Sequence, residues 1–168
     1  RIDRDTSGLV MISKKRSTLK LVQDLLREHK IQKTYAAIVK GQVSLDQQLI
    51  DAPLFRYELA NGERRVRVSK EGKPSKTEWN VVERFKAATL VHASPLSGRT
   101  HQIRVHGLSI GHPLIGDDKY GHSTAYAGPE VRRLCLHAMR LQIPGYPTIE
   151  APMPEDMQQV LNELRKHK

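Results

Sequence analysis

The sequence contains a single cysteine and no long apolar run, and both absences limit what the protein can be. Cys135 alone cannot form an internal disulfide or a thiolate-rich metal cluster, as expected of a protein from a reducing cytosol. No stretch approaches the roughly 18 consecutive apolar residues of a membrane span, and none has the pattern of a secretory leader. We therefore expect a cytoplasmic protein without a membrane segment, with Cys135 as a small buried hydrophobic residue.

Several catalytic and ligand-binding patterns are also missing. No glycine-rich phosphate loop of the Walker or Rossmann type is present. His101, His106 and His112 are separated by five and six residues, whereas two-histidine metal sites on helices use a spacing of four. Without cysteine ligands to add, the sequence predicts no metal site. The sequence shows no histidine that would be expected to pair with Ser7, so a serine-hydrolase site would lack its general base.

Basic residues are plentiful. The 168 residues include 28 Lys and Arg against 18 Asp and Glu, for a formal net charge of +10. This length suits one domain, and the charge favours a polyanionic partner, with nucleic acid ahead of an anionic membrane. Residues 62–76 concentrate this charge and are expected to form a basic loop or hairpin.

Hydrophobic patterning predicts a mixture of strands and helices. Strands are expected at residues 9–12, 34–40, 78–85, 88–94 and 134–143. Helices are expected from Ser17 onward, over residues 100–109, and in a C-terminal segment that begins near Pro154. The sequence therefore predicts an α+β fold with a sheet-forming middle.

Asp3 is the first candidate catalytic residue. A carboxylate between Arg1 and Arg4 stays ionised, as a nucleophile requires. For an isolated aspartate, a surface ion pair or a turn-opening role would be the better interpretation. Asp3 and Asp5 are two residues apart and would point to opposite faces of an extended segment, which favours one carboxylate per site.

A second candidate group surrounds residue 100. Arg99 follows Gly98 in a turn, and Arg104 is expected on the next helix, so each could reach a carboxylate or a phosphate. A solvated basic face is the alternative for either arginine alone. His101 is expected on the same helical face as Arg104, as a hydrogen-bonding support.

Tyr35 is a candidate for stacking on an extruded base. It follows Lys33 on a predicted strand, and the lysine could contact the nucleic-acid backbone. The alternative is a half-buried aromatic residue of the sheet.

These segments together match the motifs of a known family. Residues 1–8, Arg-Ile-Asp-Arg-Asp-Thr-Ser-Gly, closely resemble the catalytic signature of the RluA-type pseudouridine synthases, His-Arg-Leu-Asp followed two residues later by Thr-Ser-Gly. The signature's leading histidine is absent from the chain, which starts at Arg1, and Ile2 replaces the usual leucine. Residues 32–35 resemble the family's tyrosine motif, residues 98–106 with 111–117 its third motif, and residues 136–138 a final one.

The resemblance implies the pseudouridine synthase fold, a mixed, largely antiparallel sheet flanked by helices and loops, with the active site in a basic cleft. It implies isomerisation of uridine to pseudouridine in RNA, most closely 23S-type ribosomal RNA of the large subunit, without a cofactor. Residues 1–168 would be the catalytic domain, lacking its upstream strands and any S4-type RNA-binding domain. We expect a monomer.

The resemblance also assigns roles to residues. Asp3 would be the nucleophile, Arg104 its charge partner, and Tyr35 the platform for the flipped uracil. Asp3 could attack the anomeric carbon or C6, or abstract a ribose proton. Arg1 would fill the space that the base leaves. RNA contacts are expected from Arg1, Arg4, Lys33, Arg64, Arg65, Arg67, Arg99 and His101. The alternative from another class is a non-catalytic RNA-binding fragment that retains the basic cleft.

Overall fold

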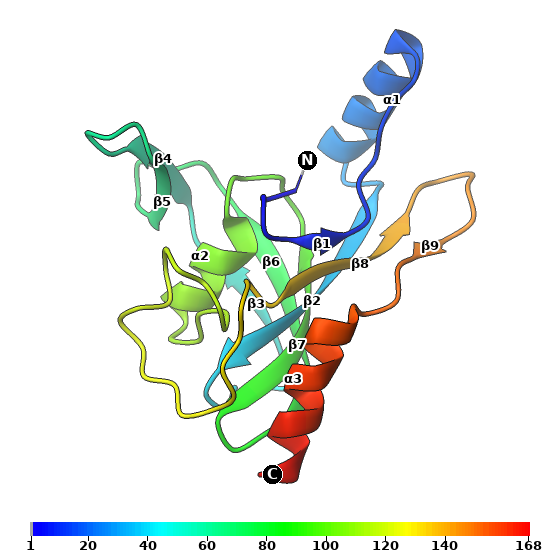
Figure 1. Cartoon of the computed structure of the whole chain (residues 1–168). Coiled ribbons are helices and arrows are strands. Elements are labelled where there is room, and N and C mark those ends of the chain that lie inside the picture. Colours follow the sequence, from blue (N-terminus) through cyan, green and yellow to red (C-terminus); the bar gives the residue numbers. More distant parts are fainter. Residues whose placement is uncertain (1) are drawn as a thin grey trace.

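The fold is built around a mixed sheet (Figure 1). The structure is a computed structural model and describes residues 2–168. Its strands are β1 (Ser7–Gly8), β2 (Gln32–Lys40), β3 (Gln47–Asp51), β4 (Leu54–Glu58), β5 (Arg64–Val68), β6 (Lys76–Arg84), β7 (Ala88–Pro95), β8 (Leu136–Gln142) and β9 (Ile149–Glu150). Its helices are α1 (Arg16–Arg27), α2 (Gln102–Ser109) and α3 (Glu155–Lys166).

The strand order of the sheet is β1-β8-β2-β7-β6-β3, with β9 paired to β8. The short β1 runs parallel to β8, and the other neighbouring strands pair antiparallel. The predicted α+β class and the mixed, largely antiparallel sheet are therefore confirmed. Strands β4 and β5 form a separate antiparallel hairpin.

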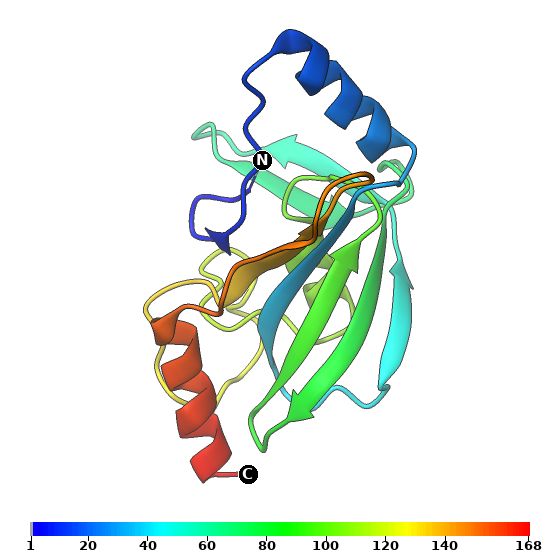
Figure 2. The same cartoon turned by 90° about the vertical axis from the view of Figure 1, so that its right-hand side faces the viewer.

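The sheet has a hydrophobic core on each face. Successive side chains of a strand point to opposite faces, so Ala37 and Val39 of β2 pack with Trp79 on one side, while Ala36 and Ile38 face the other. The first core lies beneath α2. The second core is covered by α3, whose buried side chains are Met157, Leu161 and Leu164. Figure 2 shows α3 lying along this side of the sheet.

Most of the predicted elements are present, with small shifts at their ends. The expected strand at residues 9–12 is wrong: this segment is irregular, and the strand is β1, just before it. Val10 and Ile12 are exposed, so the run does not insert into a core. The basic segment 62–76 is neither one loop nor one hairpin. Its first half contributes β5, and Lys76 begins β6.

Helix α1 extends away from the sheet in both views (Figures 1 and 2). None of its residues is buried, although its apolar residues share one face as predicted. None of the helices within residues 2–168 is long and apolar enough to cross a membrane.

Candidate active site

The loop that carries Asp3 is attached to the sheet by backbone hydrogen bonds. The Thr6 N–H donates to the Asp3 carbonyl at 3.1 Å and closes a turn. Ser7 and Gly8 then pair with His137 and Ala138 of β8. A Cβ atom on Gly8 would lie 2.2 Å from the Ala138 carbonyl oxygen, and its φ of +103° also favours glycine. The Thr-Ser-Gly part of the motif therefore positions Asp3 by close approach to β8.

Side chains attach the same loop a second time. Arg133 donates to the Asp5 carbonyl and to Ser7 Oγ, each at 3.2 Å, and pairs with Asp156 at the start of α3. Ser7 Oγ also lies 2.8 Å from His137 Nδ1, so the expectation that Ser7 lacks a histidine partner is wrong. The partner comes from β8, far away in sequence. Neither residue lines the cavity described below, and the pair anchors the loop.

Arg104 is the electrostatic centre of the site. Its Nε and Nη2 atoms donate to the two carboxylate oxygens of Asp117 at 2.8 and 2.7 Å, and its Nη1 atom lies 3.5 Å from Asp3 Oδ2. Its guanidinium also lies over the Tyr120 ring, 5.1 Å from the centroid. Arg104 is 6% exposed, so the alternative of a solvated basic face is wrong for this residue. The expected charge contact with Asp3 is present, but Asp117 is the closer partner.

Asp117 has the hydrogen bonds that a buried carboxylate needs. It accepts from Arg104 and from the backbone N–H groups of Lys119 and Tyr120, at 3.0 and 3.1 Å. Burial would raise the pKa of Asp117, but the hydrogen bonds and charge of Arg104 hold it below its usual value. Asp117 therefore remains ionised and fixes the direction of the guanidinium.

The turn before α2 is held by a buried glutamine. The Gln102 side-chain oxygen accepts from the Ser97 hydroxyl at 2.7 Å and the Arg99 N–H at 3.1 Å, while its amide donates to the Lys76 carbonyl at 2.9 Å. His101 does not lie on the helix as expected; it precedes α2 with a φ of +53°. This conformation is uncommon for a residue other than glycine.

A chain of hydrogen bonds orients His101. The Val66 N–H of β5 donates to the Tyr120 hydroxyl at 3.0 Å, and that hydroxyl lies 2.6 Å from His101 Nδ1. The hydroxyl can donate its own proton to Nδ1, and a neutral imidazole then carries its proton on Nε2. Burial and the neighbouring Arg104 lower the pKa of His101. The expected supporting role fits a neutral imidazole whose orientation depends on the β4–β5 hairpin.

These groups surround a cavity of about 80 Å³, the active-site cavity. Asp3, Tyr35 and Arg104 line it together, although they come from an N-terminal loop, a central strand and a helix. Burial, and secondarily the charge of Asp3, raise the pKa of Tyr35. The Tyr35 hydroxyl therefore keeps its proton at neutral pH.

The predicted RNA-binding residues divide into two groups. Lys33, Arg99 and His101 line the cavity. Arg4 is exposed and does not line it. Arg64, Arg65 and Arg67 lie on β5 of the separate hairpin, and Arg1 lies outside the described residues. The structure brings the three proposed catalytic residues together, and the β5 arginines do not line this cavity.

Asp117 and Tyr120 were not among the predicted site residues. Asp117 ends the segment 111–117 that resembles the family's third motif, and this was its sequence signal. Tyr120 follows within the same turn, because Asp117 accepts its N–H. A carboxylate thirteen residues after a buried arginine has no local pattern that would pair the two.

Comparison with known proteins places the chain in a family. Residues 1–109 match the family model described as RNA pseudouridylate synthase, and the chain belongs to this family. Ribosomal large subunit pseudouridine synthase C of Pasteurella multocida (strain Pm70) is 45% identical over 176 residues, which cover 100% of this chain and 54% of that protein. The Escherichia coli (strain K12) protein of the same name is 47% identical over 175 residues, covering 98% and 55%. The chain thus spans about half the length of these curated relatives.

Solved structures agree on the fold. Human RNA Pseudouridylate Synthase Domain Containing 4 is similar with a TM-score of 0.80 at 25% identity, covering 98% of this chain and 74% of that one. Human RNA Pseudouridylate Synthase Domain Containing 1 has a TM-score of 0.74 at 24% identity, covering 98% and 78%. The expected pseudouridine synthase fold is therefore confirmed.

Proposed function

We propose that the protein isomerises uridine to pseudouridine in the RNA of the large ribosomal subunit. The main support is the convergence of Asp3, Arg104 and Tyr35 on one cavity. Family membership and the names of the similar bacterial proteins support the substrate class. In this proposal residues 1–168 form the catalytic domain, and the protein acts in the cytoplasm.

The reaction replaces one bond to ribose C1′ with another and moves one proton. The bond from uracil N1 to ribose C1′ breaks, the base turns, and C5 bonds to C1′. The C5 proton leaves, and N1 gains a proton, so the product is an isomer of the substrate. Asp3 acts as the nucleophile at C1′ or C6, or as the base that removes a ribose proton. These three routes share the requirement for an ionised Asp3 within the cavity.

The remaining groups hold the reactants. The Arg104 guanidinium lies 3.5 Å from Asp3 and stabilises its charge, while Asp117 prevents the arginine from moving away. Tyr35 offers a ring on which a flipped uracil can stack, which offsets part of the cost of extruding the base, a few kcal/mol. A role for its hydroxyl in moving the C5 proton is tested by Tyr35→Phe.

Pseudouridine mapping tests the proposal. Large-subunit ribosomal RNA from cells that lack the protein is expected to lose pseudouridine at defined positions, and the wild-type gene is expected to restore them. The Asp3→Asn gene should not restore them at equal protein abundance. A full set of pseudouridines in the deleted cells would contradict the ribosomal substrate. A non-catalytic RNA-binding role predicts equal maps with both genes.

A further inference from the structure

A second cavity adjoins the active-site cavity. It has a volume of about 220 Å³ and lies between the C-terminal end of α1 and the ends of β2, β6 and β7. Lys33, Pro95, Ser97 and Gly98 line both cavities, so the two are adjacent. We call the second one the flanking cavity.

Lys33 lies at the junction of three cavities. It lines the active-site cavity, the flanking cavity and a third, of about 70 Å³, between residues 9–11 and β8. Its ammonium group has no hydrogen bond or ion pair with any other residue in the range 2–168. Burial lowers the pKa of Lys33. A desolvated, unpaired cation is unfavourable, and an anion that enters this junction would stabilise it.

The walls of the flanking cavity suit a nucleobase better than a phosphate. Leu26, Ile31, Pro95 and Leu96 provide apolar surface for the faces of a ring. Polar side chains that can bond to its edges come from Gln32, Glu78 and Ser94. The Glu78 carboxylate would repel a phosphate inside the flanking cavity, whereas Lys33 lies where this cavity meets the active-site cavity. This arrangement favours a base inside the cavity and its phosphate at Lys33.

We propose that the flanking cavity binds the base of the nucleotide next to the target uridine, and that Lys33 binds the phosphodiester that joins the two. This inference rests on the proposed function. It assigns recognition of one neighbouring nucleotide to residues that the chemical step does not use. Sequence context beside the target would then affect binding through this cavity.

A charge-neutral linkage tests the role of Lys33. Binding of the intact protein is measured with a substrate RNA that carries a methylphosphonate on one side of the target uridine and then on the other. At one of the two linkages the change should weaken wild-type binding about 10-fold or more, and Lys33→Met should weaken binding of unmodified RNA similarly. The methylphosphonate at that linkage should weaken binding by Lys33→Met by less than about twofold, because the variant already lacks the cation. Lys33→Met should also lower the salt slope by about one.

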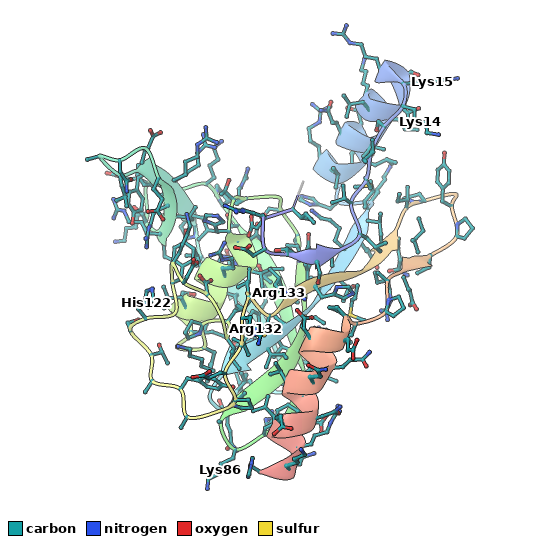
Figure 3. All side chains as sticks on the ribbon, viewed as in Figure 1. Lys14, Lys15, Lys86, His122, Arg132 and Arg133 are labelled. Atoms are coloured by element: carbon teal, nitrogen blue, oxygen red, sulfur yellow. The ribbon has the colours of Figure 1, made fainter. Side chains whose placement is uncertain are left out.

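Lys86→Met is the matched control, because Lys86 lies at the end of the molecule opposite Lys14 and Lys15 of the α1 region (Figure 3). The methylphosphonate should weaken RNA binding by Lys86→Met as much as it weakens RNA binding by the wild type. If Lys33→Met and the methylphosphonate weakened RNA binding additively at both linkages, the inference would be overturned.

An abasic nucleotide tests the cavity itself. Placed on the side identified above, it should weaken wild-type binding about fivefold or more, since the buried base is lost. Ser94→Phe partly fills the cavity and should weaken binding of intact RNA while abolishing the abasic effect. Ser44→Phe, at an exposed serine between β2 and β3, should behave as wild type. An abasic effect of equal size in Ser94→Phe and wild type would place the base elsewhere.

Wild-type turnover on unmodified RNA separates the two proposals. If no pseudouridine forms, the proposed function fails. If it forms and neither linkage depends on Lys33, only the inference about the flanking cavity fails.

Discussion

Arg104 lies closer to Asp117 than to Asp3. The two hydrogen bonds to Asp117 measure 2.8 and 2.7 Å, whereas the contact with Asp3 measures 3.5 Å. The Asp117 side chain is fully buried and that of Asp3 is 24% exposed. Asp117 therefore balances the buried charge, and Asp3 is left open to a substrate.

This difference predicts opposite effects of two matched substitutions. Asp117→Asn leaves a buried guanidinium without its counter-ion and should lower the free energy of unfolding by about 3–5 kcal/mol. Asp3→Asn should lower it by less than about 1 kcal/mol, since this carboxylate is partly solvated. Urea unfolding of both variants measures the two values. Equal losses would show that both carboxylates compensate Arg104.

Tyr35 can be tested by separating its ring from its hydroxyl. Tyr35→Phe retains the stacking surface and should bind RNA as wild type does. Tyr35→Leu removes the ring and should weaken binding by about 1–3 kcal/mol. Binding and single-turnover rates are measured together. Loss of turnover in Tyr35→Phe with normal binding would show that the hydroxyl moves a proton, and normal behaviour of both variants would remove Tyr35 from the site.

Tyr120→Phe should disturb His101 by removing the hydroxyl that contacts its ring. It removes the acceptor of the buried Val66 N–H, at a cost of about 1–3 kcal/mol, and the donor to His101 Nδ1. Nitrogen NMR of wild-type His101 should show a neutral ring with its proton on Nε2, and the variant should show a mixture of tautomers. Tyr146→Phe, at a residue 63% exposed, is the control. An unchanged His101 spectrum in Tyr120→Phe would contradict the hydrogen-bond chain.

Three histidines predict a loss of stability in mild acid. Burial lowers the pKa of His92, His101 and His106, and nearby Arg140 and Arg104 add to this effect at the first two. Below the unfolded value of about 6.5, the unfolded chain binds more protons than the folded chain, so the free energy of unfolding falls as pH falls.

Urea unfolding between pH 7.5 and 5.5 measures this slope. His106→Gln should flatten it, whereas His122→Gln, at an exposed position, should leave it unchanged. A slope as steep in His106→Gln as in the wild type would contradict the contribution of His106.

Local patterns predicted the elements whose side chains divide cleanly between core and solvent. The β2 strand and the α3 helix are examples, and motif resemblance linked Asp3, Tyr35 and Arg104. Pairings across long sequence separations could not be predicted in this way. The contacts of Ser7 with His137 and of Val66 with Tyr120 depend on which strands are neighbours. The run at residues 9–12 failed as a strand because its backbone pairing with β8 does not continue past the Leu9 N–H bond to the Ala138 carbonyl.

The central claim is that Asp3 performs the chemical step, and release of tritium from RNA labelled at uracil C5 tests it most directly. Asp3→Asn in the intact protein should reduce release to background, while RNA affinity holds or rises slightly because a negative charge near phosphate is lost. Asp5→Asn changes a neighbouring exposed carboxylate outside the cavity and should retain wild-type release. Substantial release by Asp3→Asn would contradict the assignment.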